Sequence, residues 1–241
     1  MKRLITVLAL GLWSLTTQAA LPTHAFTLDN GLKVLVREDH RAPVVTVMVW
    51  FKAGSIDEAP FETGLAHVLE HMMFKGSEHL GPGEFSRLVA RFGGSDNAFT
   101  SYDFTAYFQQ YEASRLPLAL ELEAERPKNL KIDDDAFRRE LQVVMEERRQ
   151  RTDDKPTALA WEKFQAVARP GTGYAHPIIG WRDQLAQLQP EQARSWYQRF
   201  YVPGNATLVI AGDVTPEQVR PLVDKFFGDL PKGETPPRPE T

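Results

Sequence analysis

The sequence has no cysteine among its 241 residues, no surplus of basic residues and no apolar run long enough to cross a bilayer. Without cysteine, disulfide scaffolds, thiol catalysis and thiolate metal sites are excluded, so any metal must be held by histidine and carboxylate side chains. The formal charge of −4 argues against a nucleic-acid partner. A hydrophobic content of 42% is ordinary for a globular protein and excludes a disordered chain.

The N-terminus has the pattern of a signal peptide. Lys2 and Arg3 precede an apolar run of about 12 residues, well short of the roughly 20 that a membrane helix needs. Small residues then surround a cleavage position after Ala19. We therefore expect residues 1–19 to be removed on export, with the bacterial periplasm as the simplest destination, and no membrane span afterwards. The remainder divides into a domain at residues 20–230 and a proline-rich tail or linker at residues 231–241.

The patterning predicts an α+β sandwich in which helices pack on one side of a mainly antiparallel sheet. The Asn30-Gly31 turn indicates a hairpin, because this pair accepts positive φ at low cost. The remaining assignments follow from alternation of apolar residues, helical periodicity and caps. Strands are predicted at residues 26–28, 32–36, 44–51, 95–101, 104–111 and 206–211, and helices at 63–74, 82–92, 114–126, 133–150, 156–168, 190–200 and from Pro216 to Gly228.

The sequence His67-Val68-Leu69-Glu70-His71 carries the chemistry. On a helix, His67 and His71 are about 40° apart and Glu70 lies on the same side. Two imidazoles at this spacing can hold one Zn²⁺ ion, and the adjacent carboxylate can take a proton from metal-bound water. The order of the residues is that of the inverzincin motif. The alternative is an amphipathic helix with incidental histidines.

A zinc hydrolase usually needs a third protein ligand, and three glutamates on the predicted helix 133–150 compete for this role. Glu140 and Glu147 lie on its apolar, inward-facing stripe, whereas Glu146 lies opposite, where a solvated ion pair suits it. A buried carboxylate needs a partner, which zinc or a buried arginine could provide. We favour Glu147 as the ligand and Glu140 as the residue that orients a histidine.

These motifs resemble the insulinase/pitrilysin metallopeptidases (M16), which include the mitochondrial processing peptidase type. The similarity runs from about Phe26 to Leu230. The matching segments are residues 27–32, 64–66, 67–71, 74–76, 97–101, 140–147, 201–205 and 211–213.

The resemblance implies an M16/LuxS-like α+β sandwich that holds one Zn²⁺ per chain on His67, His71 and Glu147, with Glu70 as general base. It also implies that substrate binds as an extended strand along the segment made of Asn97, Ala98, Phe99 and Thr100. An edge strand can bind peptide through its main-chain groups. Judged without the resemblance, residues 95–101 would be an ordinary surface strand.

The expected function is a zinc endopeptidase that hydrolyses peptides or unfolded polypeptide segments with a metal-activated water. Members of this type usually have two similar halves, and this chain resembles only the first. We therefore expect a partner, a second M16-like domain or subunit in a homo- or heterodimer. The alternatives are a non-catalytic or partner-dependent subunit that binds peptide, and a zinc-storing or amidohydrolase-like protein.

The sequence also departs from the family pattern at Pro127. This proline predicts a kink or break near Arg126 in the helix that contains it.

Overall fold

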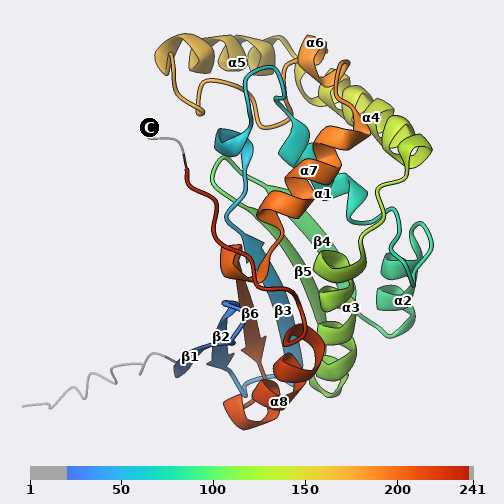
Figure 1. Ribbon diagram of the computed structural model, residues 1–241, viewed down its shortest axis with the longest axis vertical. Coiled ribbons are helices and arrows are strands. Elements are labelled where there is room, and N and C mark those ends of the chain that lie inside the picture. Colours follow the sequence, from blue (N-terminus) through green and yellow to red (C-terminus); the bar gives the residue numbers. More distant parts are fainter. Residues whose placement is uncertain (1–20, 239–241) are drawn as a thin grey trace, which may run out of the picture.

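The computed structural model describes residues 21–238, which form one six-stranded sheet covered by helices (Figure 1). The strand order is β1-β2-β6-β3-β5-β4, so that β1 and β4 are the two edges. Only β2 and β6 are parallel neighbours, as expected for a mainly antiparallel sheet. The strands are β1 (Thr23–Thr27), β2 (Lys33–Glu38), β3 (Val44–Phe51), β4 (Ser95–Thr100), β5 (Thr105–Glu112) and β6 (Ala206–Gly212). The predicted signal peptide and the last three residues of the tail lie outside the described residues.

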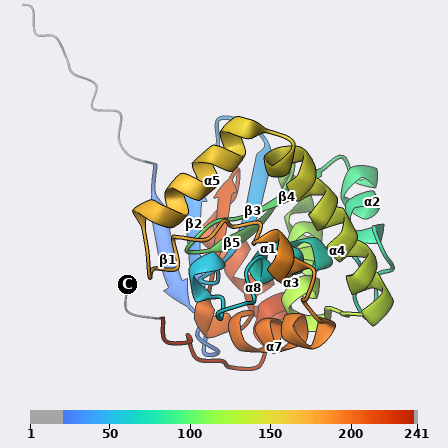
Figure 2. The same cartoon turned by 90° about the horizontal axis from the view of Figure 1, so that it is seen from above.

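The helices pack on one side of the sheet, which confirms the predicted fold class (Figure 2). They are α1 (Leu65–Met72), α2 (Glu84–Arg91), α3 (Leu116–Asn129), α4 (Asp134–Arg148), α5 (Pro156–Ala168), α6 (Arg182–Leu185), α7 (Pro190–Phe200) and α8 (Pro216–Phe227). A π-helical turn, η3 (Arg149–Asp153), follows α4. The four-residue α6 and this turn were not predicted. No helix in residues 21–238 is both long and apolar enough to span a membrane.

The hairpin β1–β2 forms around the predicted turn. Gly31 has a φ of 93°, in the left-handed region that favours glycine. The buried Asn30 side chain donates to the Phe227 carbonyl at 2.7 Å, and its oxygen accepts from the Leu32 amide. The turn is therefore fixed to the end of α8.

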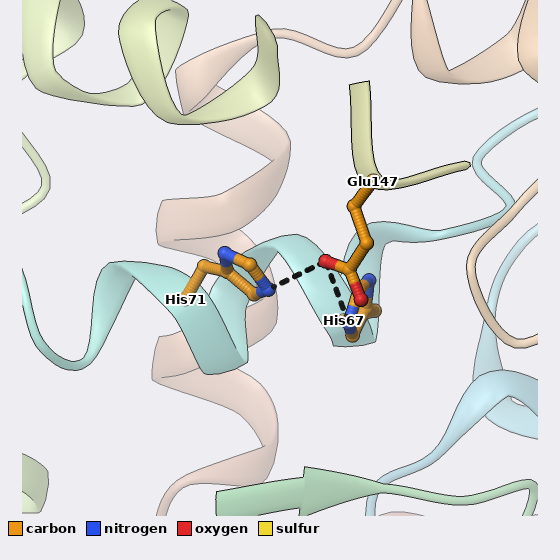
Figure 3. Close-up of side chains that lie close together, drawn as sticks. All are labelled: His67, His71 and Glu147. Carbon is orange, nitrogen blue, oxygen red and sulfur yellow. Dashed lines mark ion pairs between the residues drawn. The ribbon is translucent and has the colours of Figure 1, made fainter. Parts of the chain in front are cut away.

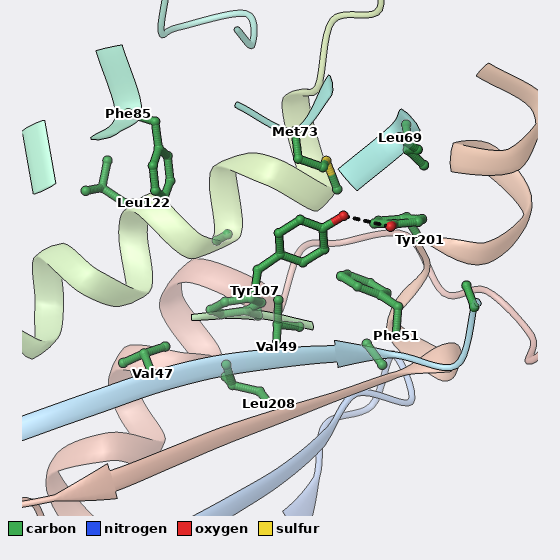
Figure 4. Close-up of a cluster of buried hydrophobic side chains, with 14 of the residues drawn as sticks. Val47, Val49, Phe51, Leu69, Met73, Phe85, Tyr107, Leu122, Tyr201 and Leu208 are labelled. Carbon is green, nitrogen blue, oxygen red and sulfur yellow. Dashed lines mark hydrogen bonds between the residues drawn. The ribbon is translucent and has the colours of Figure 1, made fainter. Parts of the chain in front are cut away.

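Alternation along the central strand β3 produces the core. Val45, Val47, Val49 and Phe51 are buried, while the residues between them face the other side of the sheet. Figure 4 shows this cluster reaching Leu69 of α1. Packing of this kind fixes one face of α1 against the sheet.

Two aromatic side chains extend the same core beneath α1. Phe51 stacks on Tyr201 with ring centroids 4.3 Å apart. The Tyr201 and Tyr107 hydroxyls are hydrogen-bonded at 2.8 Å (Figure 4). Because both tyrosines are buried, this hydrogen bond satisfies their polar ends.

Helix α3 continues through Pro127 to Asn129, so the predicted break near Arg126 is wrong. Pro127 stands in the last turn, where it lacks the N–H that would donate to the carbonyl four residues earlier. Tertiary contacts hold this turn in place. The Tyr197 hydroxyl donates to the Pro127 carbonyl at 2.8 Å, and the buried Arg126 guanidinium lies 3.8 Å from the Phe85 ring centroid.

The described part of the tail, residues 231–238, contains no helix or strand. It nevertheless lies against the rest of the domain. Thr235 donates to the Gly204 carbonyl at 2.6 Å, and Arg238 pairs with Asp57 at 3.1 Å. These contacts hold the segment on the surface from α8 to the loop before α1 (Figure 1).

Candidate metal centre

Helix α1 is anchored at its start and along one face. Gly64 precedes it with a φ of 91°, and the buried Glu58 carboxylate accepts from the Gly64 and Ala66 amides at 2.9 Å each. The apolar face buries Leu65, Val68, Leu69 and Met72. The helical period then directs the two histidines and Glu70 away from the core.

Helix α4 presents its glutamates to α1. Asp133 caps its start by accepting from the Ala136 amide at 2.9 Å. Burial of Phe137 and Val144 orients the helix so that Glu147, at its last turn, reaches the histidines. Figure 3 shows the carboxylate of Glu147 between the two imidazoles.

Three ligand atoms converge at this point. Glu147 Oε2 lies 3.3 Å from His71 Nε2 and 3.9 Å from His67 Nε2, and all three atoms lie within 4.8 Å of one another. Two ligands at about 2.0–2.2 Å from a tetrahedral Zn²⁺ ion would be about 3.4 Å apart. The spacing and the His₂Glu donor set therefore fit a zinc ion. The structure brings together the three residues favoured as ligands, whose binding role remains a prediction.

Glu140 holds the other side of the His71 ring. Its Oε1 lies 2.8 Å from His71 Nδ1, while its Oε2 pairs with Lys75 Nζ at 2.7 Å. Burial lowers the pKa of His71, but the hydrogen bonds with Glu140 and Glu147 outweigh it and raise the pKa to about 9. For His67, burial and the neighbouring His71 lower the pKa. The contact with Glu140 leaves His71 Nε2 directed at Glu147.

Glu70 lies between the metal cluster and the sheet edge. Its carboxylate accepts a hydrogen bond from the Thr100 hydroxyl at the end of β4. Burial raises the pKa of Glu70, and the hydrogen bond from Thr100 partly opposes this shift. A carboxylate in this position can accept a proton and later return it.

A cleft of about 590 Å³ joins the cluster to the edge strand. The four predicted substrate-binding residues Asn97, Ala98, Phe99 and Thr100 line it, and β4 has a neighbouring strand on one side only. Glu146 is not part of the cleft. It is half exposed and pairs with Arg149 at 2.6 Å, which keeps it away from the histidines.

Four further cleft residues were missed from the sequence: Arg151, Thr152, Ile178 and Ile179. Arg151 pairs with Glu147 Oε1 at 2.8 Å, and its position four residues after Glu147 was a signal that could have identified it. Ile178 and Ile179 reach the cleft from a loop rich in glycine and proline, where no local pattern marks them. His176, in the same loop, lies 3.7 Å from Glu58 and does not line the cleft.

Comparisons with known proteins identify related sequences and structures. The sequence profile described as insulinase (peptidase family M16) matches residues 33–181, and the profile of the peptidase M16 inactive domain matches residues 187–241. The zinc protease PqqE of Helicobacter pylori is 38% identical over 219 residues, 90% of this chain and 49% of the relative.

Two solved structures extend the comparison. A Helicobacter pylori protease has 35% identity and a TM-score of 0.88, covering 92% of this chain and 53% of that one. The first half of the periplasmic protease PqqL of Escherichia coli has 28% identity and a TM-score of 0.81, covering 92% of this chain and 50% of that one. The chain spans about half the length of the curated relatives that it matches.

Proposed function

Because the chain belongs to the insulinase family (peptidase family M16), we propose that it is a zinc-dependent endopeptidase that hydrolyses peptides or unfolded polypeptide segments. One observation carries this proposal. The converging His67, His71 and Glu147 side chains lie in the same cleft as Glu70 and a sheet edge. A metal-holding group, a proton acceptor and a surface for peptide backbone are thus within reach of one scissile bond.

In this proposal His67, His71 and Glu147 would hold one zinc ion, which would supply the positive charge needed to acidify a water molecule and polarise a carbonyl group. Glu70 takes the proton released at the attack and returns it to the departing amine. Thr100 orients the Glu70 carboxylate through its hydrogen bond. Glu140 fixes the His71 ring through Nδ1.

The edge strand β4 supplies the peptide-binding surface. Its outer side offers backbone N–H and C=O groups to an extended substrate, so that affinity depends little on sequence. The side chains of Asn97 and Phe99 are exposed beside that edge, while Thr100 links it to Glu70. A substrate strand on β4 would therefore pass Glu70.

A second M16-like half, in the same polypeptide or another, would complete the enclosure. The curated relatives are about twice as long, and the chain covers 50% of the solved first half of PqqL. The second candidate function is accordingly a subunit that binds peptide but cleaves only with its partner. Export is proposed from the pattern of residues 1–19 and from the likeness to a periplasmic protease.

The test is the variant Glu70→Gln, with zinc content measured by mass spectrometry and cleavage measured on a mixed peptide library. We expect one zinc per chain in both proteins and a loss of about 100- to 10,000-fold in the cleavage rate of the variant. Glu121→Gln, an exposed change on α3, is the control. Cleavage by Glu70→Gln at the parental rate would refute the assigned role, and a parent without zinc would refute the metal site.

A further inference from the structure

Helix α5 differs from the other helices because its apolar side chains face outward. Among its 13 residues only Glu162 is buried. Trp161, Phe164 and Val167 are 60%, 57% and 80% exposed, and the Trp161 and Phe164 rings stack with centroids 5.3 Å apart. These three residues, spaced by three, form the apolar face of α5. A contiguous apolar surface of this kind on a folded protein marks an interaction site.

The helix is held in place by charge. The Arg148 guanidinium makes two hydrogen bonds of 2.8 Å to the Glu162 carboxylate and a third, also 2.8 Å, to the Gly180 carbonyl. Both side chains of this pair are buried. Because the buried salt bridge fixes α5 from its inner side, its apolar face is already ordered, which lowers the entropic cost of binding a partner.

The segments on both sides of α5 in the sequence line the metal cleft. The turn η3, which supplies Arg151 and Thr152 to the cleft, leads directly into α5, and the loop after α5 returns to Ile178 and Ile179. Both views show α5 at the outer edge of the molecule, away from α2 (Figure 1, Figure 2). A domain bound on α5 would therefore stand at the rim of the cleft.

The C-terminal segment reaches the same region. Arg238 pairs with Asp57 and also contacts Asp103, whose carboxylate accepts from the Tyr174 hydroxyl at 2.9 Å. Tyr174 belongs to the loop that follows α5. Residues 231–238 thus connect α8 to the end of the molecule that carries the apolar face.

We propose that the apolar face of α5 is the docking surface for the second M16-type half, an inference that rests on the proposed function. The occupant is identified by three observations: relatives of about twice this length, the position of α5 at the cleft rim, and the course of residues 231–238. The surface has the composition of an interface, with two aromatic residues at the centre and exposed Lys155, Lys163 and Arg169 around them. Trp161 is the central anchor.

The test co-expresses this chain, carrying an affinity tag, with the part of the Helicobacter pylori PqqE relative that lies outside the matched 219 residues. The double variant W161E/F164E is compared with F92E, an apolar-to-acid change at the end of α2. We expect the parent and F92E to form a 1:1 complex, and W161E/F164E to bind at least about tenfold more weakly. Zinc content should be equal in all three proteins, which shows that the variants fold.

Three results would overturn the docking surface. The parent could fail to bind the second half, or W161E/F164E could bind it as the parent does. Sedimentation of the chain alone could instead show a dimer that W161E/F164E abolishes, which would place a second copy on α5. A complex that depends on α5 but cleaves no peptide would refute the proposed function and leave the docking surface standing. A complex that cleaves peptide and forms equally well with W161E/F164E would refute the docking surface and leave the proposed function standing.

Discussion

Glu147 and Arg148 are consecutive residues, yet they belong to two clusters of opposite character. Glu147 turns toward His67 and His71, so that three groups able to accept a hydrogen bond or bind a cation converge. Arg148 turns the other way, where its donors meet the Glu162 carboxylate and the Gly180 carbonyl. The successive side chains of a helix are about 100° apart, which allows this division.

The two clusters differ in the groups that meet in them. At Arg148, a guanidinium group meets the carboxylates of Glu162 and Asp153, so that cation and anions pair directly. At Glu147, the converging lone pairs favour a bound cation or a proton. The raised pKa of His71, at about 9, has the same cause, because neighbouring carboxylates stabilise its proton. One cluster is suited to holding a fold together and the other to holding a ligand. Each of the following predictions tests this difference.

The largest effect is expected from His71→Ala. Loss of one of three ligands should reduce the zinc affinity by more than about 1,000-fold and leave the purified chain without metal. The measurement is zinc content after dialysis at a fixed free zinc concentration. His79→Ala is the control, because that exposed ring pairs with Glu125 outside the cluster. A stoichiometric zinc ion in His71→Ala would show that the metal is held elsewhere.

Arg148→Met should lower the free energy of unfolding by about 3–5 kcal/mol, because it leaves the buried Glu162 carboxylate unpaired. Urea denaturation measures the change. The double variant R148M/E162L should recover most of the loss, since neither charge is then buried. Arg149→Met, which removes an exposed pair with Glu146, should leave the free energy of unfolding almost unchanged. Equal losses of unfolding free energy in Arg148→Met and Arg149→Met would show that the buried ion pair stabilises the fold no more than the exposed one.

Glu140→Gln should weaken zinc binding by about 10- to 100-fold without abolishing it, because it loosens the His71 ring and removes no ligand. Competition with a chelator of known affinity gives the dissociation constant. Lys75→Met, which leaves the Glu140 contact with His71 in place, should have a smaller effect. A zinc affinity for Glu140→Gln as low as that of His71→Ala would make Glu140 a ligand.

Glu146→Gln should have the smallest effect. Its carboxylate is half exposed and pairs with Arg149, so neither the zinc content nor the free energy of unfolding should change measurably. Glu147→Gln is the matched comparison and should lose zinc. If the two variants lost zinc equally, the choice of Glu147 over Glu146 would be wrong.

Much of the local structure could be predicted because its causes are local. The Asn30-Gly31 turn and the alternation of β3 each depend on a few neighbouring residues, and each is confirmed. Pro127 was misjudged for the opposite reason. The contacts that hold the last turn of α3, from Tyr197 and around Arg126, come from segments distant in the sequence.

The sequence by itself determined which side chains are candidate ligands. The four-residue spacing puts His67 and His71 on one face of a helix, and the inward stripe of α4 favours Glu140 and Glu147 over Glu146, because helical periodicity fixes which side chains share a face. The absence of cysteine had already limited a metal site to histidine and carboxylate.

Only the tertiary structure decided how α1, α4 and β4 meet, which side chains complete the cleft, and that Arg148 anchors α5 with its apolar face outward. Tertiary contacts join residues more than 100 positions apart in the sequence, such as the hydrogen bond from Thr63 to Gln184. Long-range packing sets such distances, and no pattern within one segment encodes them.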